Sequence, residues 1–174
     1  MPESDILVEY LRRAYHAVDG LWFMKVEEAH DFEDALETDR RVWEVLAKIQ
    51  ARQARKLLAV TGNAPEDLAE CFTLKLTADG HRFSVTVSGE AVTFAVEGCP
   101  WLDLLKKSDR QELAARIAQT ICPTEGRVWC QEFGGQCEFS MPRMACQGAE
   151  GCEMRFAWKQ DGEGPGTEGG IPGA

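Results

Sequence analysis

Hydrophobic residues recur every three or four positions over the first sixty residues, which is the spacing of amphipathic helices. The pattern breaks near His30 and Asp31, so we expect two helices that pack as an antiparallel hairpin. The first apolar stripe consists of Leu7, Leu11, Ala14, Val18, Leu21, Trp22, Val26 and Ala29. The second consists of Phe32, Leu36, Val42, Trp43, Leu46, Ile49, Ala54 and Leu57.

The spacing then changes to that of strands, after a short helix that we expect to begin near Pro65. Alternating apolar residues predict strands at 72–77, 83–87 and 92–96. The dipeptide at 79–80, Asp-Gly, is typical of a hairpin turn. These segments are expected to form a three-stranded meander with one apolar face.

The pattern after the meander predicts one helix and more strands. Ser108 should open a helix that ends at Cys122, because Pro123 disfavours helical geometry in the residue before it. We expect a second hairpin around the two glycines at 134–135, with its first strand at 127–129, and a final strand at 153–159.

This order of elements lacks the alternation of strands and helices that marks a parallel sheet, so it predicts the α+β class. The expected architecture is a helical hairpin packed on an antiparallel sheet, with the strands in two blocks separated by a helix. Residues 1–160 are expected to form a single domain. The Gly- and Pro-rich segment 161–174 has almost nothing to bury and is expected to be a flexible tail.

Charge and hydropathy narrow the range of partners. The formal net charge of −10 argues against binding to nucleic acid or to an anionic membrane surface, since both need clustered Lys and Arg. No apolar run approaches the roughly 18 residues of a membrane span. The N-terminal stretch MPESDILVEY contains acids and no basic residue, unlike a signal peptide, so we expect a cytoplasmic protein.

Four of the seven cysteines lie at the ends of expected elements, where metal and catalytic ligands usually occur. They are Cys99, Cys122, Cys146 and Cys152. Four thiolates can hold zinc or an iron–sulfur cluster, and the glycines of the 146–152 loop let backbone N–H groups approach a sulfur. Burial as small apolar groups is the alternative, and a redox-active pair of Cys146 and Cys152 is a third hypothesis.

Charged residues on the expected buried stripes indicate a second candidate site. Asp39 lies between apolar residues of the second helix, and Lys25 lies likewise on the first. A buried carboxylate is costly unless it is paired, so a structural Lys25–Asp39 ion pair is one interpretation. The other is a ligand pocket between hairpin and sheet, in which a carboxylate serves as acid or base. The predicted ligand-binding residues are Trp22, Lys25, Glu27, Asp39 and Trp43.

Three motifs carry a family resemblance: GLWFMKVEEAHDFEDALETDRRVW at 20–43, CPW at 99–101 and CQGAEGCEMRF at 146–156. Together they resemble cytosolic proteins of anaerobic bacteria and archaea that are grouped with the L-2-amino-thiazoline-4-carboxylic acid hydrolases. The last motif is also similar to the C-terminus of 4-vinyl reductase domains. The first resemblance implies hydrolysis of C–N bonds in small heterocycles. The second implies a small-molecule ligand and metal held on cysteines.

The sequence therefore favours a protein that binds a small molecule or a metal through a cysteine-thiolate site, with hydrolysis as the reaction that the resemblance implies. Its catalytic residues are not identified from the sequence. The alternative is a non-catalytic ligand sensor or scaffold of the 4-vinyl reductase type. We also expect the chain to form a homodimer.

Overall fold

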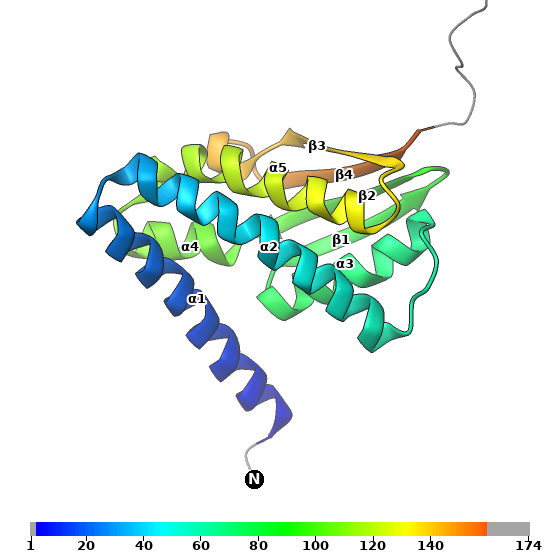
Figure 1. The fold of residues 1–174 in the computed structure, drawn as a ribbon, viewed down its shortest axis with the longest axis horizontal. Coiled ribbons are helices and arrows are strands. Elements are labelled where there is room, and N and C mark those ends of the chain that lie inside the picture. Colours follow the sequence, from blue (N-terminus) through cyan, green and yellow to red (C-terminus); the bar gives the residue numbers. More distant parts are fainter. Residues whose placement is uncertain (1–2, 160–174) are drawn as a thin grey trace, which may run out of the picture.

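Two long helices come first in the computed structural model, which describes residues 3–159. Helix α1 spans Ser4–Ala29 and α2 spans Phe32–Leu58, as the apolar stripes predict. Asp31 caps α2 by accepting a hydrogen bond from the backbone N–H of Asp34 at 2.9 Å. The two helices diverge from their junction, so the first turns of α1, before Arg12, project away from the body of the protein (Figure 1).

Helix α3, Pro65–Asp79, replaces the first strand that the alternation at 72–77 predicts. That prediction is wrong because Phe72 and Leu76 also lie one helical turn apart, and both are buried in the main core. The dipeptide Asp79-Gly80 ends this helix instead of turning a hairpin. Gly80 adopts φ of 87°, and its backbone N–H caps the last turn.

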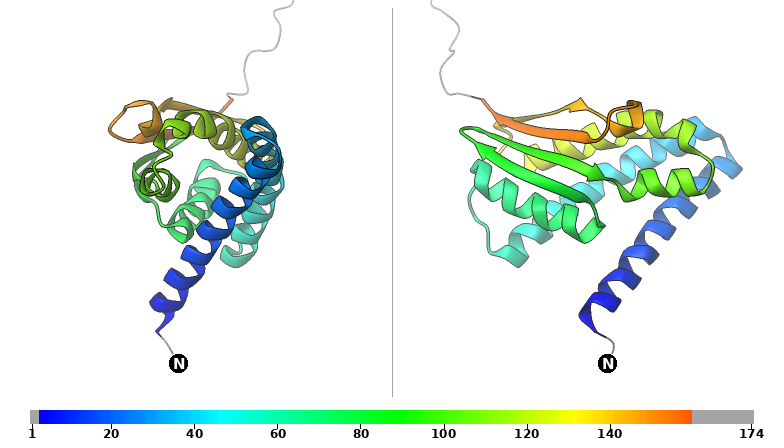
Figure 2. Two further views of the ribbon diagram at one scale, coloured as in Figure 1. Left: turned by 90° about the vertical axis from the view of Figure 1, so that its left-hand side faces the viewer. Right: turned by 180° about the vertical axis from the view of Figure 1, so that it is seen from behind.

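The sheet contains four antiparallel strands in the order β1-β2-β4-β3. The strands are β1 (Arg82–Ser88), β2 (Ala91–Gly98), β3 (Cys137–Arg143) and β4 (Cys152–Trp158). Helices cover one face of this sheet and leave the other face open (Figure 2). Val92, Phe94 and Val96 of β2 alternate toward the covered face, where they are buried.

Helix α5 (Ala114–Glu132) continues through Pro123, contrary to the predicted end at Cys122. A proline inside a helix costs roughly 3 kcal/mol, and burial of the following turns, including Trp129, offsets this cost. Residues 127–129 are therefore helical, and the predicted hairpin around 134–135 is wrong. The two glycines have positive φ and instead join the end of α5 to β3.

A short helix that the pattern does not predict, α4, spans Pro100–Lys107. Pro100 stands in its first turn, where a missing N–H costs nothing. Single turns follow at Gln111–Leu113 and at Ala145–Gln147.

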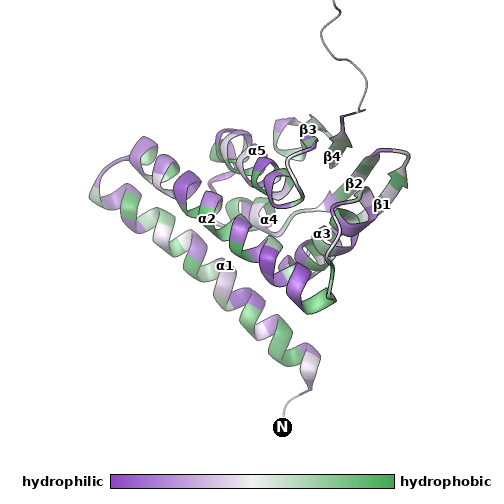
Figure 3. Ribbon diagram, turned by 45° about the vertical axis from the view of Figure 1, so that its right-hand side comes forward, coloured by the Kyte–Doolittle hydropathy of each residue, from purple (hydrophilic) through white to green (hydrophobic). Residues whose placement is uncertain are grey.

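The molecule has a main core and a smaller second cluster. The main core lies between the sheet and helices α2, α3 and α5. The second cluster brings Leu36, Trp43 and Ile121 together with Phe23 and Trp101, where α1, α2, α4 and α5 meet. Many hydrophobic residues of α1 lie outside both cores (Figure 3).

The α+β class is confirmed, with N-terminal helices, an antiparallel sheet and a helix between the two strand pairs. Within residues 3–159, no helix has the length and hydropathy needed to cross a membrane. The expected tail at 161–174 lies outside the described residues.

Candidate functional site

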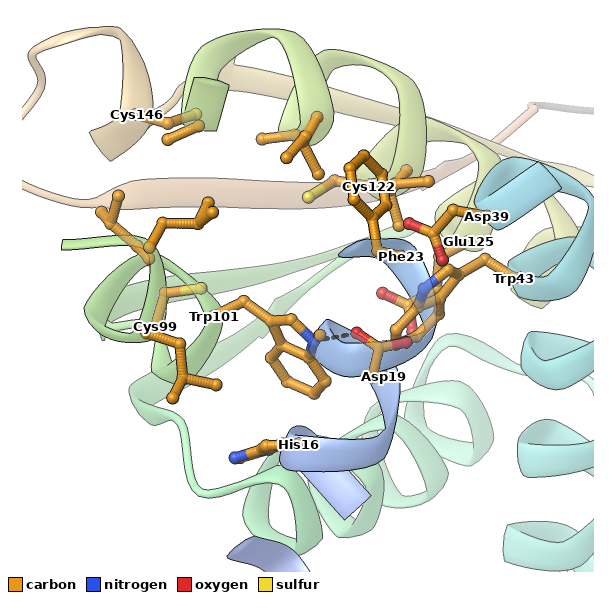
Figure 4. A pocket seen from close by; sticks show the side chains of 18 of the residues that line it. His16, Asp19, Phe23, Asp39, Trp43, Cys99, Trp101, Cys122, Glu125 and Cys146 are labelled. Carbon is orange, nitrogen blue, oxygen red and sulfur yellow. Dashed lines mark hydrogen bonds between the residues drawn. The ribbon is translucent and has the colours of Figure 1, made fainter. Parts of the chain in front are cut away.

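A cavity of about 330 Å³ lies where α1, α2, α4 and α5 meet one end of the sheet (Figure 4). Its wall is mostly apolar, and a smaller number of acidic, basic and thiol side chains interrupt it. Its apolar members include Phe23, Trp43, Trp101, Ile117 and Ile121. A mostly apolar hollow with a few convergent polar groups is typical of a small-molecule site.

Asp39 and Trp43, both predicted as ligand-binding residues, lie in this wall one turn apart on α2. Burial, together with the nearby carboxylate of Asp19, raises the pKa of the Asp39 carboxyl to about 7. The polar indole N–H of nearby Trp43 opposes this shift. Asp39 is therefore divided between its neutral and charged forms near neutral pH.

Asp19 of α1 stands opposite Asp39 and is held by Trp101 of α4. The indole Nε1–H of Trp101 donates to Asp19 Oδ2 at 2.8 Å. Burial raises the pKa of Asp19, whereas the hydrogen bond from Trp101 and the proximity of His16 lower it. Trp101 also packs against the Trp43 ring, with centroids 5.7 Å apart. These contacts fix Asp19 at the end of the cavity where Trp43 and Asp39 lie.

A buried ion network forms the floor beside this end. Lys75 Nζ lies 2.6 Å from Glu125 Oε1 and 3.1 Å from Asp79 Oδ2, and all three residues are at least 94% buried. Burial lowers the pKa of Lys75, but the two carboxylates outweigh it and the pKa rises. The lysine is thus fully charged and already paired with two acids.

Two histidines near Trp101 are uncharged at neutral pH. Burial lowers the pKa of His16, and it lowers that of His81 to about 3 with a further contribution from Lys75. Within the part of the chain that the structure describes, His16 Nε2 is buried and has no hydrogen-bond partner. An unpartnered polar atom in a cavity wall is a position for a ligand group.

The four cysteines predicted as metal ligands all line this cavity. Cys99 precedes α4, Cys122 lies in α5, and Cys146 and Cys152 flank the loop before β4. In Figure 4 the sulfurs of Cys99 and Cys146 lie at the end away from the carboxylates, with Cys122 between. The backbone N–H of Ala145 donates to Cys152 Sγ at 3.2 Å.

The four thiols line the same cavity, but within the described residues they are not placed to hold one metal ion. Burial raises the pKa of Cys99, Cys122 and Cys146, which favours neutral thiols. Over residues 3–159, no group of three or more His, Cys, Asp or Glu side chains is placed to hold one metal ion. All seven cysteines are free thiols, including Cys146 and Cys152.

Three of the predicted ligand-binding residues lie elsewhere. Trp22 and Lys25 face outward on α1, and Lys25 pairs with Glu28 at 2.6 Å, so a Lys25–Asp39 ion pair is not formed. Glu27 binds Arg110, whose side chain reaches the cavity wall. The reason is that the apolar stripe of α1 faces solvent, so residues on that stripe point away from the site.

The polar residues that the sequence reasoning missed lie on the opposite face of α1 and in segments predicted wrongly. The polar residues His16 and Asp19, with the apolar Phe23, recur at helical spacing and face the cavity. Lys75 and Asp79 are one turn apart, a spacing that a strand prediction at 72–77 conceals.

Comparison with known proteins identifies a family whose function is unknown. Residues 3–125 match a family of unknown function, DUF6125, and this segment contains Asp19, Asp39 and Trp101 but ends before Cys146 and Cys152. No curated protein matches the sequence. The resemblance to the hydrolases and to 4-vinyl reductase domains stays a prediction. Because the matched segment covers well over half of the chain, the protein belongs to the DUF6125 family.

Proposed function

We propose that this protein binds a small, largely apolar organic molecule in the cavity beside Asp39. The observation that carries this proposal is the combination of a hollow of about 330 Å³ with buried carboxylates in its wall. A folded chain gains nothing from holding Asp19 and Asp39 close together in an apolar wall, because each charge raises the cost of the other. Such an arrangement is typical of binding and catalytic sites.

The chemistry of the wall supports binding more directly than it supports a reaction. Asp39, with its pKa near 7, could accept or donate a proton, which is the role that hydrolysis of a C–N bond would require. The thiols are less suited to act as nucleophiles, because burial raises the pKa of three of them. Hydrolysis therefore remains the prediction drawn from the resemblance, and ligand binding is the function that the geometry favours.

Calorimetric titration with phenethyl alcohol, a neutral aromatic probe, tests the proposal. Ala118 lies half-buried in the cavity wall on α5, so Ala118→Phe places a ring inside the hollow. We expect the wild type to bind the probe and Ala118→Phe to bind it at least about tenfold more weakly. Gln119→Phe puts the same ring on the exposed side of the same helix and should leave binding unchanged.

Equal binding of the probe to the wild type and to a folded Ala118→Phe variant would contradict the proposal, as would no binding to either. Circular dichroism establishes that both variants fold.

A metal site is the second candidate, and one observation favours it: four cysteines far apart in sequence line one cavity. All four predicted ligands, Cys99, Cys122, Cys146 and Cys152, carry the sulfur that zinc prefers. Their present spacing does not fit a bound ion, and no step is assigned to one. Elemental analysis of anaerobically purified protein tests this candidate, and zinc or iron at less than one atom per chain would count against it.

A further inference from the structure

We propose that the ligand of this cavity carries a protonated amine, which the carboxylates of Asp19 and Asp39 bind beside the rings of Trp43 and Trp101. This inference rests on the proposed binding function and specifies the class of ligand.

The charges around the cavity leave two acids without a cation. Two basic side chains line the wall within the described residues, and both already have partners. Lys75 pairs with Asp79 and Glu125, and Arg110 pairs with Glu27. The histidines in the wall, His16 and His81, are held neutral.

Asp19 and Asp39 therefore face the hollow without an ion pair in the described part of the chain, and Asp19 accepts its hydrogen bond from Trp101. A cation placed between the two carboxylates would relieve both their mutual repulsion and the cost of their burial. A ligand that brings a positive charge is bound more tightly for this reason than one that does not.

The surrounding groups favour an organic cation over a metal ion. No group of three or more metal-binding side chains in residues 3–159 is spaced for chelation, whereas indole rings border both carboxylates. Aromatic faces attract ammonium groups, and Trp is the best of them. His16 Nε2, which is buried and unpartnered, provides a further position for an N–H or O–H of the ligand.

The affinity for an amine should increase with pH. The groups that face Asp39 are Asp19 and Trp43. Those that face Asp19 are His16 and Trp101, and Asp79 lies farther away. Lys75 and Glu125 form the neighbouring floor. Because the pKa of Asp39 is about 7, its carboxyl is mostly neutral at pH 6 and mostly charged at pH 8. An amine that stays protonated over this range gains a partner as Asp39 ionises.

A matched pair of probes tests the inference: phenethylamine and phenethyl alcohol have nearly the same shape but differ in charge. At pH 8 we expect the amine to bind at least about tenfold more tightly, the margin of one charge-assisted hydrogen bond. The difference should shrink at pH 6. Asp39→Asn and Asp19→Asn should each reduce binding of the amine to nearly that of the alcohol, and Glu37→Gln on the exposed face of α2 should change neither.

The outcomes separate the two proposals. If both probes bind and the amine has no advantage, the amine inference is overturned and the proposed binding function stands. If neither probe binds, both fail. Tighter binding of the carboxylate analogue hydrocinnamate than of the amine would also overturn the inference.

A second inference comes from the outer face of α1, and it is independent of the cavity. Leu11, Val18 and Leu21 are 64%, 62% and 56% exposed, although they belong to the most regular apolar stripe of the chain. With Leu7 and Ala14 they alternate at spacings of four and three, which is the seam of a coiled coil. The opposite face of α1 is the one that packs on the body of the protein through His16 and Asp19.

The structure points to a second copy of the chain as the occupant of this seam, with the two α1 helices antiparallel and crossing near Ala14. In this register Leu7 faces Leu21 of the other copy, and the small Ala14 lets the helices approach. The acidic start of α1, with Glu3, then lies beside Lys25 of the other copy, which within its own helix pairs with Glu28. A parallel pair would instead set Glu3 against Glu3 and Lys25 against Lys25.

Sedimentation equilibrium of the full chain tests this inference. We expect a dimer for the wild type and a monomer for both Leu11→Glu and Val18→Lys. Leu11 of one copy lies near Val18 of the other only in the antiparallel register, so mixing the two variants should restore a dimer.

Circular dichroism provides the check that both variants remain folded. A monomeric wild type at micromolar concentration would overturn the inference, and a dimer that survives both substitutions would do the same.

Discussion

Asp39 occupies a position in α2 where a charged carboxylate destabilises the folded chain. Apolar neighbours and Asp19 raise its pKa from the ordinary 3.8 to about 7. In the unfolded chain the group ionises near pH 4, so between pH 4 and 7 the folded state binds more protons than the unfolded state. The stabilising contribution is complete below pH 4 and is lost as the pH rises to about 7.

The substitution Asp39→Asn removes this penalty and should therefore stabilise the protein. We expect the free energy of unfolding to rise by about 1 to 3 kcal/mol at pH 8, allowing for solvent screening, and to change little at pH 4.5. Thermal unfolding at the two pH values is the measurement. Glu37→Gln on the same helix breaks a surface pair with Arg40 and should slightly lower the melting temperature at pH 8. A loss of stability at pH 8 in Asp39→Asn would contradict the raised pKa.

A variant that is more stable and binds amines less well would identify Asp39 as a residue retained for function, because packing alone favours its removal. The sequence already marked Asp39 as unusual, since it interrupts an apolar stripe. It did not reveal Asp19, whose effect depends on a helix face that only the packing of α1 defines.

At the scale of elements, the close contact between α5 and β3 depends on Gly126. A Cβ atom at this position would overlap the ring of Phe139 on β3. Gly20 in α1 differs, because a Cβ there meets no atom within 4 Å. Two glycines inside helices thus have opposite roles.

Alanine substitutions at these two glycines should therefore have opposite effects on stability. Gly20→Ala should stabilise by about 0.5 to 1 kcal/mol through helix propensity. Gly126→Ala should destabilise by about 1 to 3 kcal/mol, since Phe139 must move. Chemical denaturation measures both. If Gly126→Ala raised the free energy of unfolding, the prediction would be contradicted, because α5 and β3 would then pack less closely than in this structure.

The errors in predicting elements have the same physical origin. Residues 72–77 fit either period, and the helix prevails because it buries Phe72 and Leu76 while pairing Lys75 with Asp79. Pro123 is tolerated because tertiary burial of α5 outweighs the lost hydrogen bond. In both segments, contacts distant in sequence decided between local alternatives.

At the scale of the whole molecule, the cavity exists only because helices from distant parts of the chain meet one end of the sheet. Asp19 and Asp39 come from α1 and α2, and the thiols come from segments between residues 99 and 152. The inner face of α1 builds this site, while its outer face carries the unpartnered seam. If two copies pair through that seam, each keeps its own cavity on the far side of α1.

The sequence by itself determined the α+β class, the two long helices, strands β1, β2 and β4, and the grouping of Asp39 with Trp43, because hydrophobic periodicity and helical spacing are local properties. Only the tertiary structure decided which face of α1 packs inward, that Asp19 and not Lys25 lies near Asp39, and that four distant thiols line one cavity. These outcomes depend on which buried surfaces fit together, and the energy of a buried charge depends on neighbours that the chain brings from far away.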